Sequence, residues 1–353
     1  MYQLLGRDSP LPNIKENLLS SIFSFASETK LYFLDGVRLS SKGEPPLSKN
    51  LLSTNLAGLK LANPTILASG ILGYTGGSMQ RVAEAGAGAV VTKSVGIEPR
   101  AGYPNPTVVQ AEAGLINAIG LPNPGINDFA EEITYAKRVL NVPLIVSVFG
   151  YTAEEYALAA EKAAKAGADA VELNVSCPHV KDTGHEIGQH PKTLAEVVEK
   201  VKASVKKPVI VKLSPNVTDI VEIAKTAVKA GADALTAVNT VKAMAIDVEA
   251  QMPVLSNVKG GLSGPAIKPI ALQCVYDIFE ADLKVPIFGC GGITTWRDAV
   301  EFLLAGASAV QIGTAIALDD LSVFQTINKG LQAYLIKKGY GSVKEIVGLA
   351  HLG

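Results

Sequence analysis

The sequence predicts an α/β fold in which a barrel of parallel strands is surrounded by helices. Three observations point to it. The chain has 353 residues, enough for one large domain with a deep core. Hydrophobic residues make up 48% of it and charged residues only 18%, as expected for a parallel sheet covered by helices. A short pattern of small residues also recurs four times along the chain.

The recurring pattern joins the end of a helix to the start of a strand. Its copies are Ala85–Val90, Ala166–Val171, Ala230–Leu235 and Ala305–Val310. Each copy has glycine at its second position, which suits the left-handed residue that closes a helix. The copies are separated by about twice the length of a βα unit of roughly 30 residues. We therefore expect a second strand within each interval.

Apolar runs supply eight candidate strands. In chain order they are Thr65–Ser69, Ala87–Thr92, Leu144–Phe149, Ala170–Asn174, Pro208–Leu213, Ala234–Val238, Pro286–Cys290 and Ala309–Ile312. Eight strands that alternate with helices predict a (β/α)8 TIM barrel. The alternative is an open doubly wound sheet, which is disfavoured because no GxGxxG turn follows the first strand.

Residues 1–53 are predicted to be an N-terminal extension and linker, and residues 54–353 to be the barrel domain. Residues 39–49 are rich in Ser, Pro and Gly, as is typical of a linker. Residues 17–34 predict a weakly amphipathic helix that packs on the barrel or docks on a membrane surface or partner. We expect no signal peptide and no membrane span, because no apolar run has the required length or flanks.

Charge and cysteine content exclude several classes of function. The formal net charge is -1, which disfavours a nucleic-acid partner. Cys177, Cys274 and Cys290 show no CxxC spacing. This argues against a disulfide framework and against a metal or iron–sulfur site within the chain, and it favours a reducing cytoplasm.

The carboxyl ends of barrel strands carry the functional residues of this fold. Here those ends supply Ser69, Gly70, Lys93, Ser94, Asn174, Cys177, Lys212, Asn239, Thr240, Gly291, Gly292, Gly313 and Thr314. A charge at the mouth of a buried strand needs a partner, so Lys93 and Lys212 are predicted to be functional. The glycine-rich turns after the last two strands are predicted to bind phosphate through backbone N–H groups.

Eight segments resemble the FMN-dependent dihydroorotate dehydrogenases and occur in the order found in that family. They are Ala62–Gly70, Val91–Ser94, Ile116–Gly125, Glu172–Pro178, Val211–Ile220, Gly260–Leu272, Gly289–Ile293 and Gln311–Ala315. Cysteine rather than serine at position 177 resembles the class 1 enzymes, and two of the segments look most like the class 1B catalytic subunit. The resemblance implies an iron–sulfur flavoprotein partner subunit that passes electrons to NAD, within a homodimer or heterotetramer.

The resemblance also implies a reaction: oxidation of dihydroorotate to orotate in pyrimidine biosynthesis. Cys177 would be the base that takes the proton from C5, while the hydride at C6 passes to N5 of FMN. The implied substrate-binding residues are Lys93, Asn117, Ile119, Gly120, Leu121, Asn174, His179, Asn239 and Thr240. The implied FMN-binding residues are Ser69, Gly70, Lys93, Ser94, Asn174, Lys212, Val238, Gly264, Gly291, Gly292, Gly313 and Thr314. The segment Val180–His190 is expected to be a lid over the substrate.

His179 departs from the class 1 pattern, which has asparagine there. The CPH sequence and Asn239–Val241 are similar to the dihydropyrimidine dehydrogenases, but the Ile116–Gly125 turn looks like the dihydroorotate type. The first alternative is therefore an enzyme acting on uracil or thymine or on their dihydro forms. Two others stay open: a flavin-binding barrel without catalysis, and an aldolase or isomerase that uses Lys212 as a Schiff-base nucleophile. The electron acceptor stays open among NAD through a partner, fumarate and quinone.

Overall fold

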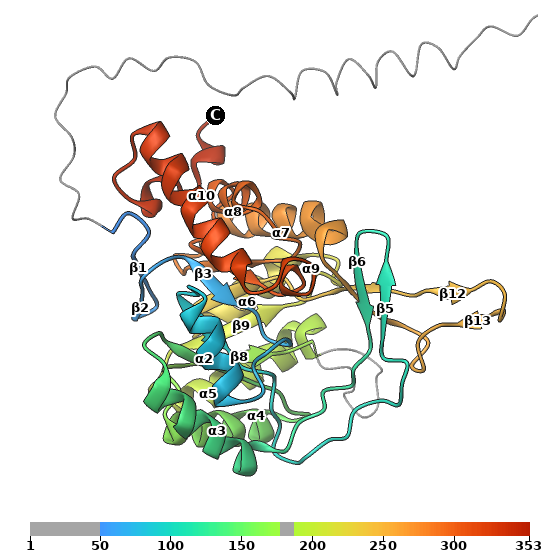
Figure 1. Ribbon diagram of the computed structural model, residues 1–353. Helices are drawn as coiled ribbons and strands as arrows, with labels where there is room; N and C mark the ends of the chain where they lie inside the picture. Colours follow the sequence, from blue (N-terminus) through green and yellow to red (C-terminus); the bar gives the residue numbers. More distant parts are fainter. Residues whose placement is uncertain (1–49, 177–186) are drawn as a thin grey trace, which may run out of the picture. The chain divides into compact units, whose positions relative to one another are not determined.

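Eight parallel strands close into a barrel in the computed structural model, which describes residues 50–176 and 187–353 (Figure 1). The barrel strands are β3 (Thr65–Leu67), β4 (Ala89–Val91), β7 (Leu144–Val148), β8 (Ala170–Asn174), β9 (Val209–Leu213), β10 (Ala234–Ala237), β15 (Ile287–Cys290) and β16 (Ala309–Ile312). They follow one another around the barrel in chain order, and β16 pairs with β3 to close it. The predicted (β/α)8 barrel is thus confirmed, with several strands one to three residues shorter than expected. The extension helix predicted for residues 17–34 lies outside the described residues.

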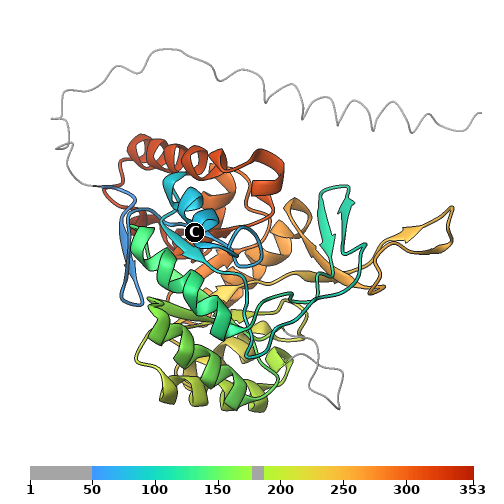
Figure 2. The same ribbon diagram turned by 60° about the horizontal axis from the view of Figure 1, so that its bottom comes forward.

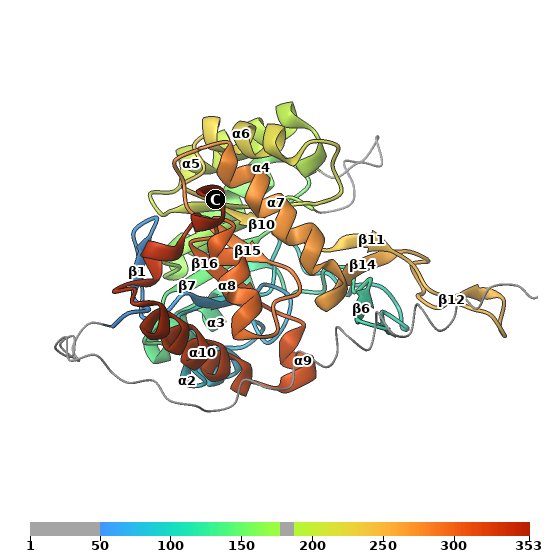
Figure 3. The same cartoon turned by 90° about the horizontal axis from the view of Figure 1, so that it is seen from above.

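Helices flank the strands. They are α2 (Gly76–Glu84), α3 (Ile126–Val139), α4 (Ala153–Ala166), α5 (Pro191–Ser204), α6 (Ile220–Lys229), α7 (Lys268–Glu280), α8 (Trp296–Leu304), α9 (Ala315–Asp319) and α10 (Ser322–Lys338). In Figure 3, α4, α5 and α6 lie on one side of the strands, and α2 and α10 on the other. Short 3-10 turns are Ile187–Gln189, Pro265–Ile267, Val343–Ile346 and Leu349–His351. The repeat glycines all have positive φ, which confirms the predicted left-handed helix ends: Gly86, Gly167, Gly231 and Gly306.

Smaller antiparallel elements, which the sequence did not predict, accompany the barrel. A hairpin is formed by β1 (Thr54–Leu56) and β2 (Leu59–Leu61). A four-stranded sheet contains β5 (Val108–Ala111), β6 (Gly114–Asn117), β14 (Gly260–Ser263) and β11 (Val241–Ala243), and a further hairpin contains β12 (Ile246–Asp247) and β13 (Met252–Pro253). The β5–β6 and β12–β13 hairpins extend to the same side of the barrel (Figures 1 and 2). The four-stranded sheet carries Asn117 at the end of β6 and adjoins Thr240 and Gly264.

The barrel interior has an apolar layer below a polar layer. Side chains alternate along each strand, so residues two apart point the same way. The apolar layer, which includes Ala170, Ile210, Ala234 and Ala309, packs in one cluster with Leu56, Leu59 and Leu61 of the β1–β2 hairpin. Two residues further along their strands lie the buried side chains of the polar layer: Glu172, Lys212, Thr236 and Gln311. The amino end of the barrel is therefore filled with apolar side chains, and its carboxyl end has a polar floor.

Asp298 anchors the loop that follows β15. One carboxylate oxygen accepts hydrogen bonds from the N–H groups of Thr294 and Thr295, at 3.0 and 2.7 Å, and the other is 2.7 Å from Lys268 Nζ. Partial burial would raise the pKa of Asp298, but these hydrogen bonds lower it to about 2. The ionised carboxylate thereby fixes this loop to the first turn of α7.

We expect Asp298→Asn to lower the free energy of unfolding by about 2 kcal/mol at pH 7, because the depressed pKa measures the preference of the folded state for the carboxylate. The contribution is present above the unfolded pKa of about 4 and is lost as the pH falls towards about 2. Urea titrations should therefore show the wild type and variant converging over this range.

The matched control is Glu301→Gln. Glu301 pairs with the same Lys268, at 2.8 Å, but its side chain is 44% exposed. An exposed pair contributes about 0–1 kcal/mol, so this variant should unfold close to the wild type. Equal losses in the two variants would contradict the assigned role of Asp298.

Candidate active site

A cavity of about 640 Å³ opens at the carboxyl ends of the barrel strands. Its lining includes every described residue that the sequence nominated: Ser69, Gly70, Lys93, Ser94, Asn117, Ile119, Gly120, Leu121, Asn174, Lys212, Val238, Asn239, Thr240, Gly264, Gly291, Gly292, Gly313 and Thr314. Cys177 and His179 lie outside the described residues, as does most of the predicted lid. Positions far apart in sequence thus converge on one site.

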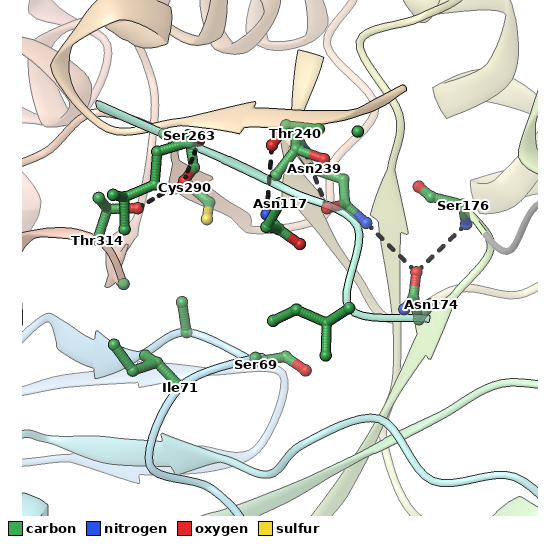
Figure 4. A pocket seen from close by; sticks show the side chains of 18 of the residues that line it. Ser69, Ile71, Asn117, Asn174, Ser176, Asn239, Thr240, Ser263, Cys290 and Thr314 are labelled. Atoms are coloured by element: carbon green, nitrogen blue, oxygen red, sulfur yellow. Dashed lines mark hydrogen bonds between the residues drawn. The ribbon is translucent and has the colours of Figure 1, made fainter. Parts of the chain in front are cut away.

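Asn174 connects three of the loops that border the cavity. Its Oδ1 accepts hydrogen bonds from Asn239 Nδ2 and from the N–H of Ser176, both at 3.3 Å (Figure 4). Its Nδ2 donates to Ser94 Oγ at 3.0 Å. The Asn117 amide, held by a 3.2 Å bond from Nδ2 to a carbonyl of β14, borders the same cavity. The three amides are therefore held in fixed orientations, and each offers both donors and acceptors.

The backbone turn after β6 has a strained, well-defined shape. Gly120 has φ +80°, and a Cβ there would come within 2.7 Å of the Tyr103 backbone nitrogen. Leu121 adopts φ 55°, which is unusual for a residue other than glycine. Arg100 donates from Nε to the Gly120 carbonyl at 3.4 Å and from its guanidinium to the Tyr151 hydroxyl. These contacts hold the turn against the cavity.

Two lysines line the cavity while being almost fully buried: Lys93 is 7% exposed and Lys212 is 5% exposed. Burial lowers the pKa of Lys93, and repulsion by Lys212 lowers it further. Burial would also lower the pKa of Lys212, but attraction to Cys290 when its sulfur is ionised, and to the Glu172 carboxylate, opposes this effect, and the pKa is raised. The site therefore concentrates positive charge in a region shielded from water, where electrostatic interactions are strong.

Glycines form another part of the cavity lining. Gly264, Gly291 and Gly292 have φ of +95°, +133° and +74°, a range that side chains rarely adopt. Thr314 follows Gly313 and donates to Ser263 Oγ at 2.8 Å (Figure 4). Glycines allow the backbone to approach a ligand closely, and the phosphate site predicted for these turns stays a prediction.

Sequence reasoning missed several polar residues that line the cavity or lie beneath it. Arg100 and Tyr151 belong to separate loops that come together only in the folded protein. Neither residue lies in a sequence motif that resembles the family. Glu172 and Gln311 carried a signal, because each is a polar residue at an inward position of an otherwise apolar strand. Such a residue is buried whatever its polarity and so needs partners inside the barrel.

The sequence matches a known family, dihydroorotate dehydrogenase, over residues 51–335. That match covers the whole barrel and every described residue of the site. The chain belongs to the dihydroorotate dehydrogenase family. The predicted resemblance is thereby confirmed, and with it an oxidoreductase from a family of flavoproteins.

Individual relatives indicate which type of dihydroorotate dehydrogenase the chain resembles. A protein named dihydroorotate dehydrogenase B (NAD(+)), catalytic subunit, from Pyrococcus abyssi is 57% identical over 300 residues, which cover 85% of this chain and 99% of the relative. Proteins of the same name from Thermococcus kodakarensis and Methanosarcina mazei are 56% and 52% identical, covering 85% and 86% of this chain and 98% and 96% of the relatives. These names agree with the predicted class 1B type. Within residues 50–176 and 187–353, no helix is both long and apolar enough to span a bilayer.

Proposed function

We propose that this chain oxidises dihydroorotate to orotate, a step of pyrimidine biosynthesis, and that FMN bound in the cavity accepts the electrons. The observation that carries the proposal is the meeting of three asparagine amides, a backbone turn and two buried lysines in one cavity. Family membership supports the same reaction. The arrangement suits a planar, anionic substrate beside a flavin ring.

The residues present fit FMN. The volume of about 640 Å³ lies within the roughly 300–1,000 Å³ typical of small-ligand pockets. Of the residues that the structure describes, a Cβ added at Gly313 would touch only the Ala68 Cβ, at 3.4 Å, so these residues leave room at this position. When bound, FMN would supply the hydride acceptor. Lys93 and Lys212 would favour the negative charge that reduction brings to it.

The amides and the turn are assigned to the substrate. Asn117, Asn174 and Asn239 would hold the N–H and C=O edges of the ring, because each amide presents a donor and an acceptor. The backbone around Ile119–Leu121 would receive the carboxylate. Fixing the ring in this way aligns its reacting carbons with the flavin and removes the entropic cost of orientation.

Cys177 is assigned as the base. It comes next after Ser176, which lines the cavity. A thiol has an ordinary pKa near 8.5, and cationic neighbours stabilise the thiolate that can accept a proton. In the proposed step the C5–H bond breaks and its proton passes to the sulfur of Cys177. His179 belongs to the same segment and motivates a comparison with dihydrouracil.

We also propose an electron-transfer partner subunit. The relatives are named as catalytic subunits of NAD(+)-linked enzymes, which implies a second subunit in those proteins. The same arrangement would carry electrons from this chain to NAD, as the resemblance to class 1B implies. The homodimeric or heterotetrameric assembly and the cytoplasmic location stay predictions.

Anaerobic addition of dihydroorotate should bleach the visible absorbance of the FMN-loaded protein within one turnover. Dihydrouracil should bleach it much more slowly, because it lacks the carboxylate that the Ile119–Leu121 turn would hold. Stopped-flow absorbance gives both rates. Faster bleaching by dihydrouracil would transfer the assignment to the dihydropyrimidine branch.

Cys177→Ala should slow flavin reduction by dihydroorotate about 10²–10⁴-fold while FMN stays bound, since a positioned base contributes that much. Cys274→Ala is the matched control. Cys274 lies on α7, and burial raises its pKa to about 11, so it is a poor nucleophile and base. Full activity in the Cys177 variant would refute the assigned base and favour a barrel that only binds flavin.

Gly313→Ala should weaken FMN binding by roughly tenfold or more, about 1.4 kcal/mol, because its methyl group would occupy ligand space. The urea midpoint without FMN should hardly change, since the added Cβ makes only an ordinary contact. Gly77→Ala on α2, where a Cβ meets nothing within 4 Å, is the control. Fluorescence titration with FMN compares the three proteins, and equal affinities would contradict the placement of FMN beside Gly313.

A further inference from the structure

Glu172 is a carboxylate buried in the middle of the barrel. Its side chain is 0% exposed, and it belongs to the polar layer below the cavity. Its Oε2 accepts hydrogen bonds from Gln311 Nε2 at 2.6 Å and Thr236 Oγ1 at 3.0 Å. Its Oε1 accepts no hydrogen bond from the part of the chain that the structure describes. That oxygen is instead 3.9 Å from Lys212 Nζ.

Lys212 lies between this carboxylate and the cavity. Its Nζ donates to Gln311 Oε1 at 3.3 Å, so Gln311 bridges the ammonium and the carboxylate. Lys212 and Gln311 both line the cavity, whereas Glu172 does not. Glu172 is therefore connected to the cavity through the contacts that it makes with these two side chains.

Four groups face Lys212 from the surrounding elements. Glu172 on β8 attracts it, Lys93 after β4 repels it, and Gln311 on β16 is neutral. Cys290 at the end of β15 is the fourth, and burial raises the pKa of its thiol. A protonated thiol carries no charge, which leaves the Glu172 carboxylate as the acidic group beside Lys212 in the part of the chain that the structure describes.

Stability alone does not explain a buried ion pair. Removing two charges from water costs several kcal/mol for each ion, and well-packed apolar replacements are often equally or more stable. The pair is also incompletely satisfied, since Oε1 has no hydrogen-bond partner among the described residues and the Nζ–Oε1 distance exceeds that of a direct hydrogen bond. An ion pair with this desolvation cost, directly beneath the ligand cavity, indicates a role in ligand binding or catalysis rather than in stability.

We propose that Glu172 is a positioning residue that keeps the Lys212 ammonium charged at the floor of the cavity, ready to stabilise negative charge on a reduced flavin. This inference rests on the proposed function, because it assumes a flavin in the cavity. Without Glu172, burial and the repulsion from Lys93 would drive Lys212 to its neutral form, as happens to lysines buried without a partner. The ammonium would then form only when reduction places an anion beside it.

The test is the midpoint potential of bound FMN, measured anaerobically from about pH 6 to pH 9, a range that brackets a lysine pKa lowered by burial. In the wild type, Lys212 is already charged, so reduction to the flavin anion should take up about one proton for two electrons. In Glu172→Gln, Lys212 should gain its proton together with reduction. The uptake should rise to about two protons, which doubles the slope of potential against pH.

Two variants separate this role from a structural one. Thr236→Val removes one hydrogen bond to Glu172 but keeps its charge, so its slope should equal that of the wild type. Glu172→Gln combined with Lys212→Met removes both charges and should also show a single proton, since the titrating group is gone. A doubled slope in either of them would overturn the proposal.

The remaining outcomes are equally decisive. If the slope of potential against pH in Glu172→Gln equals that of the wild type, the inference is overturned. It is also overturned if the wild type itself takes up two protons on reduction, a result that does not depend on whether the variant folds. A protein that binds FMN but is not reduced by dihydroorotate would remove the proposed substrate and leave this measurement intact. Failure of the wild type to bind FMN would instead contradict the proposed function from which the inference starts.

Discussion

Closure of the strands into a barrel is the constraint on which the rest of this structure depends. Closure gives every strand one inward face, and the pleat then assigns alternate residues to it. Ala170, Glu172 and Asn174 lie two apart on β8, and they meet in turn the apolar layer, the polar layer and the cavity. The same step leads from Ile210 to Lys212 on β9. The change from apolar side chains at the amino end of the barrel to functional polar side chains at the carboxyl end can thus be followed along a single strand.

The polar layer works as a unit because hydrogen bonds connect its members. Gln311 donates to the Glu172 carboxylate and accepts from Lys212, and its amide also contacts Thr236 at 3.2 Å. Each of these side chains comes from a different strand, so the layer also fixes how those strands sit relative to one another. Hydrogen bonds in such a shielded interior are stronger than in water. The cavity above therefore rests on a rigid floor that carries charge.

The sequence predicted the barrel well because its strands are apolar runs set between glycines and prolines, and a repeated helix-to-strand turn marks their spacing. The four-stranded antiparallel sheet was not predictable in the same way. Strands such as β5, with alternating exposed and half-buried residues, have little apolar signal, and β6 pairs with β14, which lies far away along the chain. The Arg100–Tyr151 contact was missed for the same reason, since it depends on where two loops meet. Sequence motifs were enough to predict the site residues, whereas the contacts among Glu172, Lys212 and Gln311 could be found only from the folded structure.

The β1–β2 hairpin has a consequence for the order of events in catalysis. By filling the amino end of the barrel with Leu56, Leu59 and Leu61, it leaves the carboxyl face as the route into the cavity. A substrate must therefore enter, and its product leave, on the same side. If a flavin is bound there, as proposed, an oxidant that had to reach it through that entrance would compete with the product for space. The proposed transfer of electrons to a separate subunit would avoid this competition.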